Sequence, residues 1–293
     1  MALFKRKKTI VALGHSASGK SCYMQVAISY LFRHGKEFRL ISEDTNLDKV
    51  TDKTRDILRK GEWPDKTLGV NKYQLQRLTW ARLVKYDCTL FDWMGEAFTT
   101  AGLEWEGRRD EAAERWKRYV SITKDEFEES CKQADGFLLF LDGERLLEND
   151  EESDLMCACL YWLKDLIMKN NKKRRFSILV TKSDFLEGTR EFGTADGKVD
   201  EEKIFNYIRN KYNAFFSMLE NNHYTDFDLV DEIINRYSYL VAPVTCLPVR
   251  EHRKENANGT FANKDWELQD MEQSNIISAS DMVEPLRWLI RHL

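Results

Sequence analysis

The segment Gly14–Ser21 constrains the fold of this chain more than any other part of it. Its sequence, GHSASGKS, fits the pattern G-x-x-x-x-G-K-[ST] and follows the apolar run Ile10–Leu13. Apolar residues at helical spacing come after it, so the segment joins a predicted strand to a predicted helix. Glycines in such a loop let backbone N–H groups point at a phosphate, and the helix N-terminus adds partial positive charge. The alternative interpretation is a glycine-rich turn without a ligand.

The side chains of this loop predict nucleotide binding with a metal ion. Lys20 would reach the β- and γ-phosphates, and the Ser21 hydroxyl would coordinate Mg²⁺. The residues expected to surround the phosphates are Gly14, His15, Ser16, Ala17, Ser18, Gly19, Lys20, Ser21 and Cys22.

Composition excludes some classes of function. The charged fraction is 32%, yet the net charge is only -4, which argues against a general nucleic-acid binder. No apolar run approaches the roughly 20 residues that span a bilayer. The six cysteines lie mostly in apolar segments and form no C-x-x-C pair, as expected of reduced thiols in a cytoplasmic protein.

Strands and helices alternate along the chain. The expected strands are 10–13, 37–42, 72–83, 85–91, 136–141, 176–180 and 239–245. The expected helices are the segment after Ser21 and residues 44–60, 104–132, 154–169, 201–219, 227–236 and 282–292. This order predicts an α/β fold with a mostly parallel sheet, helices on both faces and one antiparallel edge strand at 72–83. We expect a single domain, 1–293, with helical insertions near 43–62, 97–132 and 187–236 and an exposed loop near 250–275.

Ligands of such sheets bind at the carboxyl ends of the strands, and candidate residues occur there. Asp92 follows the strand 85–91 and begins the motif D-x-x-G, which ends at Gly95. This aspartate can hold Mg²⁺ through a water, and the Gly95 N–H can meet the γ-phosphate. A threonine should complete the Mg²⁺ coordination, and Thr67 is the candidate. Its competitors, Thr45 and Thr51, fall in a predicted helix.

Another motif follows the strand 176–180. Thr181, Lys182 and Asp184 resemble the N-K-x-D motif with which GTPases recognise guanine, with threonine in place of asparagine. Asp184 would accept hydrogen bonds from guanine, and the Lys182 stem would lie along the base. Thr245-Cys246 follows the strand 239–244, where GTPases place a pair whose N–H contacts the guanine oxygen. The alternative for 181–184 is a charged loop.

Taken in order, these motifs resemble the translation-factor-related (TRAFAC) class of P-loop GTPases over essentially the whole chain. The resemblance implies a three-layer Ras-like fold, GTP or GDP with Mg²⁺, and a switch that acts on a partner protein. Three features narrow this resemblance further: the insertion before GEWPDKT, the version DWMGE of the D-x-x-G motif, and the segment DMVEPLRWLI. These features are similar to the bacterial double-GTPase families of GTPase-associated conflict systems, which implies a neighbouring effector or partner protein.

Phosphoryl transfer depends mainly on positioning and charge neutralisation, which Lys20, Thr67, the loop amides and Mg²⁺ would supply. Glu96 follows D-x-x-G at the position where Ras-like GTPases carry a water-orienting glutamine. A carboxylate there can orient or deprotonate water, but it also repels the γ-phosphate, so we expect slow turnover without a partner. The alternative is a glutamate favoured by the dipole at a helix N-terminus.

The segment after Glu96 is rich in arginine and aromatic residues. Arg108, Arg109, Arg115 and Arg118 are either sources of an arginine finger or the solvated face of a helix. Trp105, Trp116 and Tyr119 are either core residues or a partner-binding surface. Ser16 would crowd the place where a partner's arginine enters.

Two other functions fit the same loop. An ATP-using P-loop enzyme, such as a small-molecule kinase, needs no guanine motif, so the segment 181–184 would then be coincidental. A non-hydrolysing, nucleotide-gated scaffold would keep the fold but lack turnover.

Overall fold

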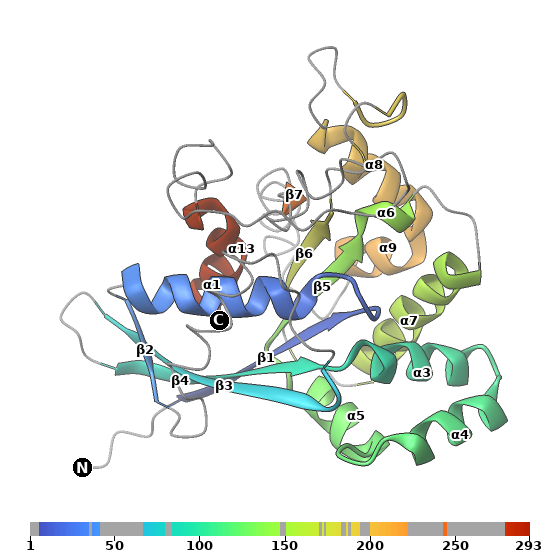
Figure 1. The fold of residues 1–293 in the computed structure, drawn as a ribbon, viewed down its shortest axis with the longest axis horizontal. Coiled ribbons are helices and arrows are strands. Elements are labelled where there is room, and N and C mark those ends of the chain that lie inside the picture. Colours follow the sequence, from blue (N-terminus) through green and yellow to red (C-terminus); the bar gives the residue numbers. More distant parts are fainter. Residues whose placement is uncertain are drawn as a thin grey trace, which may run out of the picture.

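A computed structural model describes residues 6–34, 37–41, 67–79, 84–146, 151–169, 172, 174–182, 186, 189–193, 200–221, 243–244 and 279–293. Strands and helices alternate along these residues, as predicted. Helices lie on both faces of one sheet, which is an α/β arrangement consistent with three layers (Figure 1).

The sheet of the described residues has seven strands in the order β2-β3-β4-β1-β5-β6-β7. The strands are β1 (Arg6–Gly14), β2 (Phe38–Leu40), β3 (Val70–Leu78), β4 (Val84–Trp93), β5 (Gly136–Asp142), β6 (Arg175–Thr181) and β7 (Pro243–Val244). β4, β1, β5, β6 and β7 are parallel, whereas β3 is antiparallel to both β2 and β4. The predicted antiparallel strand therefore exists, but it is not outermost, because the short β2 pairs with its outer edge.

Two groups of helices enclose the sheet. α1 (Lys20–His34) and α13 (Ala279–His292) pack together on one face, where Tyr23 of α1 meets Phe140 of β5 with ring centroids 5.3 Å apart (Figure 1). The other described helices are α3 (Gly95–Trp105), α4 (Arg109–Arg118), α5 (Lys124–Gln133), α6 (Gly143–Leu146), α7 (Glu151–Met168), α8 (Glu201–Lys211) and α9 (Asn213–Asn221). Phe137 and Phe176, from the opposite face of β5 and β6, stack at 5.1 Å, and Phe215 of α9 packs edge to face on Phe176.

The stretch predicted as helical over 104–132 is mostly helical, but it is divided: it contains the end of α3, then α4 and most of α5. Gly107 adopts φ 89°, and its N–H bonds to Glu104 O while the Arg108 N–H bonds to Leu103 O. This pair of bonds is the Schellman motif that ends helices, and it favours glycine at the left-handed position. α5 begins at a capping box, in which Thr123 and Glu126 each accept a hydrogen bond from the other's backbone.

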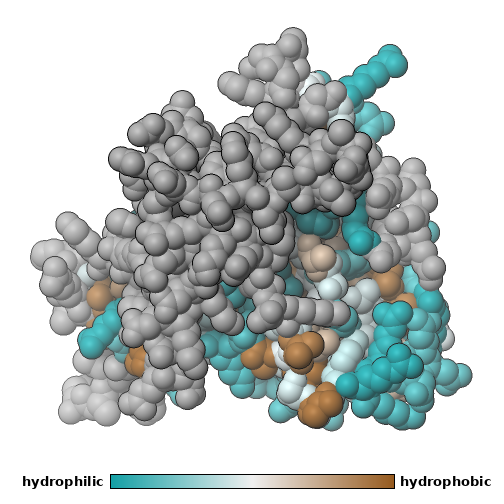
Figure 2. Space-filling model, in the orientation of Figure 1, coloured by the Kyte–Doolittle hydropathy of each residue, from teal (hydrophilic) through white to brown (hydrophobic). Residues whose placement is uncertain are grey.

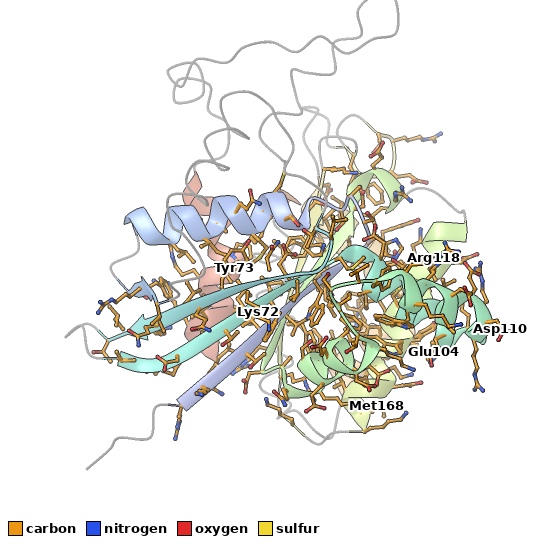
Figure 3. The ribbon with its side chains drawn as sticks, turned by 60° about the horizontal axis from the view of Figure 1, so that its bottom comes forward. Lys72, Tyr73, Glu104, Asp110, Arg118 and Met168 are labelled. Carbon is orange, nitrogen blue, oxygen red and sulfur yellow. The ribbon has the colours of Figure 1, made fainter. Side chains whose placement is uncertain are left out.

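The other predictions differ in detail. The helix predicted over 201–219 is divided at Tyr212 into α8 and α9. The strand 239–245 is described only at β7, and the helices 44–60 and 227–236 and the loop 250–275 lie outside the described residues. On β3 the predicted alternation holds from Lys72 to Leu75, where Lys72 is exposed and Tyr73 is buried (Figure 3), and it ends at the adjacent buried residues Leu75 and Gln76. The side chains of one strand thus alternate between the core and solvent.

Large apolar side chains are exposed at a few described positions, notably Leu68 and Val120, which are 76% and 101% exposed. Figure 2 shows small hydrophobic patches among hydrophilic surface on the side of the molecule that carries α3–α5. None of the helices traced in the described ranges has the length and apolar character needed to cross a bilayer.

Candidate functional site

The site lies where the parallel strands end. Ala12 of β1 pairs with Asp92 of β4, and Asp142 of β5 pairs with Thr181 of β6, so these residues reach the same edge of the sheet. The loop 15–19 leaves β1 at this edge and leads directly into α1. Residues far apart in the sequence therefore meet around the N-terminus of α1, as the sequence predicts for a ligand site.

The loop 15–19 has the backbone of an anion-binding nest. Ala17 and Gly19 adopt φ angles of 62° and 74°, so left-handed residues alternate with ordinary ones, as in anion-binding nests. Gly14 has no room for a side chain, since a Cβ there would lie 2.8 Å from Phe140 Cβ. The Ser18 hydroxyl is buried and has no hydrogen-bond partner in the described structure. It is available as a donor to an anion in the loop.

Three side-chain oxygens converge at the start of α1. Ser21 Oγ lies 2.9 Å from Thr67 Oγ1 and donates a hydrogen bond of 3.1 Å to Asp92 Oδ2. The Asn71 amide donates to the same carboxylate oxygen at 3.2 Å. Thr67 therefore lies beside the two residues with which the sequence analysis grouped it.

Lys20 and Asp92 form a buried ion pair at the base of this cluster. Lys20 Nζ lies 3.8 Å from Asp92 Oδ1, and the two residues are 5% and 0% exposed. A charge this well buried needs a partner, because an isolated ion in the interior is strongly destabilising. The pair holds the Lys20 ammonium next to the loop.

These oxygens fit a hard divalent cation. Mg²⁺ prefers oxygen ligands and usually takes one or two carboxylates together with waters and phosphates. Asp92 Oδ1 is buried and receives no hydrogen bond within the described residues, so it keeps a lone pair for a metal-bound water. No cluster of three or more His, Cys, Asp or Glu occurs in the described ranges. The fit thus rests on hydroxyl oxygens combined with a single carboxylate.

The first turn of α3 packs directly on the loop. A Cβ at Gly95 would lie 2.3 Å from the Ser16 nitrogen and 2.5 Å from the His15 carbonyl carbon, so only glycine fits there. Glu96 follows, and its Oε1 accepts a hydrogen bond of 3.1 Å from the Ser16 hydroxyl. The Gly95 backbone and the Glu96 carboxylate are therefore both adjacent to the loop.

His15 faces a thiol on α7. Its Nε2 lies 3.9 Å from Cys159 Sγ, and that thiol donates to Phe98 O at 3.3 Å. Burial raises the pKa of the Cys159 thiol well above its usual range, so the sulfur stays protonated. A reactive cysteine needs the thiolate form, and this contact is therefore core packing behind the loop.

The segment after β6 also contacts the loop. The Thr181 hydroxyl donates to Ser18 O at 2.7 Å and lies 3.2 Å from Leu141 O. Lys182 adopts φ 52°, and its Nζ binds Asp142 Oδ2 at 2.6 Å and Glu144 Oε2 at 3.0 Å.

Charge and burial have opposite effects on the pKa values of Asp142 and Lys182. Burial raises the pKa of Asp142, although the Lys182 ammonium opposes the shift. Burial lowers the pKa of Lys182, but the two carboxylates outweigh it and raise that pKa. Lys182 therefore remains charged and is held in one position.

Comparison with known proteins adds no relative to this picture. No protein-family model matches the chain, and no curated protein matches it significantly.

Other predicted site residues lie elsewhere or outside the described ranges. Asp184, Thr245 and Cys246 are outside the described residues, and Cys22 is a buried core residue of α1. Of the candidate arginines, Arg108 and Arg115 both pair with Glu111 on α4, at 2.6 and 2.8 Å, as expected of a solvated helix face. Figure 3 places Glu104, Asp110 and Arg118 on the α3–α4 side of the molecule, away from β3.

The aromatic residues of this region divide between core and surface. Trp116 and Tyr119 pack against the core, whereas Trp105 is 43% exposed and donates its indole N–H to Asp165 at 2.8 Å.

Sequence reasoning missed two site residues. Asp142 directly follows the buried strand 136–141, so the strand-end rule that found Asp92 would have found it. Asn71 gave no such signal, because it lies at the beginning of an antiparallel strand.

Proposed function

We propose that the protein binds GTP together with Mg²⁺ and hydrolyses it in the cytoplasm, acting as a nucleotide-dependent switch for a partner protein. The observation that carries this proposal is the meeting of Lys20, Ser21, Thr67 and Asp92 beside the loop 15–19. A sheet with helices on both faces and these residues at its strand ends is also what the resemblance to P-loop GTPases implies. The similarity to double-GTPase families extends the proposal to an effector of a bacterial conflict system.

Each group has a distinct task in this proposal. The loop N–H groups and Lys20 bind the β- and γ-phosphates, and Ser21, Thr67 and Asp92 would hold Mg²⁺. Bound there, Mg²⁺ would neutralise charge on the phosphate oxygens. Glu96 borders the loop and orients the attacking water, while its negative charge opposes the γ-phosphate and keeps turnover slow.

Guanine recognition is assigned to the end of β6. Thr181 fastens the loop through Ser18 O, and Asp142 and Glu144 hold Lys182 so that its stem can lie along the base. Asp184 would accept the guanine N–H groups. Thr181, which stands in place of asparagine in this motif, therefore attaches the loop to β6 through its hydrogen bond to Ser18 O.

A nucleotide-gated scaffold without turnover is the second candidate. The Ser16 hydroxyl engages the Glu96 carboxylate, which reduces the freedom of that group to act on water. Single-turnover measurements separate the two candidates, because a scaffold retains bound GTP unchanged.

Nucleotide competition tests the proposal. GTP and GDP should displace a fluorescent guanine nucleotide far better than ATP, and Asp184→Asn should shift the preference toward xanthine nucleotides. Asp92→Asn should remove the Mg²⁺-dependent part of GTP binding. Its control is Asp87→Asn on the same strand, where the carboxylate accepts a bond from Gln76, away from the loop 15–19. Equal affinity for ATP and GTP would favour the ATP-using enzyme instead.

A further inference from the structure

The connection between α4 and α5, residues 119–122, contacts both flanks of the candidate site. The Ser121 hydroxyl donates to Leu68 O at 2.8 Å, on the residue that follows Thr67. The Tyr119 hydroxyl donates to Glu96 O at 3.2 Å. One short segment thus binds the backbone beside the proposed Mg²⁺ ligand and the backbone of the residue that faces the loop.

A third hydrogen bond closes these contacts into a ring. The Met94 N–H donates to Gly69 O at 2.9 Å, which joins the 67–69 segment to the start of α3. Gly69 also lies against the connection, since a Cβ there would be 2.6 Å from Ser121 Oγ. The segments 67–69, 94–96 and 119–122 therefore contact one another in pairs, and moving one of them breaks contacts to the other two.

The connection itself is anchored in the core. Ile122 is 4% exposed, and Tyr119 meets Trp116 edge to face at 5.5 Å. Trp116 in turn lies 5.9 Å from Phe127 of α5, which is fully buried. The ring is therefore attached to a rigid base rather than to a free loop.

We propose that residues 119–122 act as a positioning clamp that holds Thr67 and Glu96 in place together. This inference rests on the proposed function, in which Thr67 holds Mg²⁺ and Glu96 orients water. Moving the backbone that follows Thr67 requires either breaking the bond from Ser121 to Leu68 O or moving the connection, which is also bound to Glu96 O. Because coupling between sites is reciprocal, Mg²⁺ and GTP at Thr67 stabilise the connection in return.

The test removes one hydroxyl of the ring at a time. Ser121 is exposed, so Ser121→Ala should leave the fold intact while loosening the ring. Losing a single hydrogen bond typically changes an equilibrium constant about threefold to tenfold. We expect the Mg²⁺ concentration for half-maximal GTP binding to rise by that factor in Ser121→Ala and in Tyr119→Phe. GDP binding without Mg²⁺ should stay within about twofold, and Ser121→Thr should restore the wild-type value.

Hydrogen exchange on the nucleotide-free protein tests the clamp independently of the proposed function, because it needs no bound nucleotide. In Ser121→Ala the Met94 amide should exchange about threefold to tenfold faster. The control is Ser130→Ala, whose hydroxyl bonds to Phe127 O within α5 and which should leave Met94 unchanged. If the wild-type protein binds no nucleotide, the proposed function fails, and the exchange result still decides whether the ring exists. Unchanged Met94 exchange, or an unchanged Mg²⁺ requirement in a protein that binds GTP, overturns the clamp.

Discussion

The Ser16 hydroxyl donates a hydrogen bond of 3.1 Å to Glu96 Oε1 across a separation of 80 residues. The bond joins the loop after β1 to the first turn of α3. It restrains the one carboxylate that the sequence assigns to water activation.

Glu96→Gln should separate the charge of this residue from its hydrogen bond, because the amide oxygen still accepts from Ser16. Removing the negative charge should strengthen GTP binding about twofold to fivefold relative to GDP, since a charge at the protein surface acts weakly through solvent. Glu96→Ala loses the hydrogen bond as well. Single-turnover hydrolysis should change in both variants, and identical rates in all three proteins would exclude a catalytic role.

Gly95→Ala should disrupt the loop. The new methyl group would overlap the backbone of Ser16, and overpacking of this kind typically costs about 1–3 kcal/mol. We expect a lower melting temperature and at least about a tenfold loss of nucleotide affinity, since a loop amide must move.

The matched control is Gly107→Ala. Its φ of 89° strains any side chain, yet no atom lies within 4 Å of the new Cβ. It should lose stability, by about 1 kcal/mol, without losing affinity. Loss of binding in both variants would mean that stability alone explains the effect.

Thr181→Val should weaken the attachment of the loop to β6. Valine has the shape of threonine but no donor, so the carbonyl of Ser18 loses its partner at a cost of about 1–3 kcal/mol. Chemical denaturation should show this loss, nucleotide affinity should fall with it, and Thr181→Ser should recover both. Ser177→Ala on the same strand removes a buried hydroxyl that has no partner in the described structure, and it should be nearly neutral. A neutral Thr181→Val would refute the fastening role.

The ion pair between Glu37 and Arg291 predicts a dependence of stability on pH. Arg291 binds Glu37 through two bonds of 2.7 and 3.1 Å, and these bonds lower the pKa of the carboxyl below 4.5. A lowered folded pKa contributes stability that is fully present above the unfolded pKa and is lost as the pH falls through the folded value.

Both side chains of this pair are more than a third exposed, so screening limits the effect at pH 7 to about 0.5–1 kcal/mol. Glu37→Gln should show this loss in urea denaturation at neutral pH, and the difference from the wild type should shrink as the pH falls through the folded pKa of Glu37. Arg291→Gln should behave in the same way. A difference that does not depend on pH would contradict the assignment.

The positions of the strand-end residues could be predicted from the sequence because parallel strands leave little freedom. Gly14, Asp92 and Thr181 each follow or end an apolar run, and parallel pairing brings such positions to one edge of the sheet. Thr67 was selected because its competitors, Thr45 and Thr51, fall in a predicted helix, and it lies beside Ser21. These successes depend on local patterns that fix both an element and its direction.

The elements and site residues that the sequence did not predict have physical causes too. The prediction of helical structure over 104–132 did not use two local signals. Gly107 ends one helix, and the T-x-x-E capping box at Thr123 begins another. Asn71 and Ser121 act through contacts that exist only in the folded chain, so no spacing rule finds them. Asp184 lies outside the described residues, and its assignment to guanine stays a prediction.

The packing of α13 has a consequence for how the protein can be made. Tyr23 of α1 accepts a hydrogen bond from the Leu286 N–H, and Leu289 lies within 3.0 Å of the Cβ position of Gly136. Helix α1, which begins at Lys20 and follows the loop, therefore packs on residues of α13. Those residues are synthesised about 250 residues after α1. During synthesis the contacts that α13 makes with α1 and with this face of the sheet form only after that helix emerges. A fragment that ends before Ala279 should aggregate rather than yield a minimal nucleotide-binding unit.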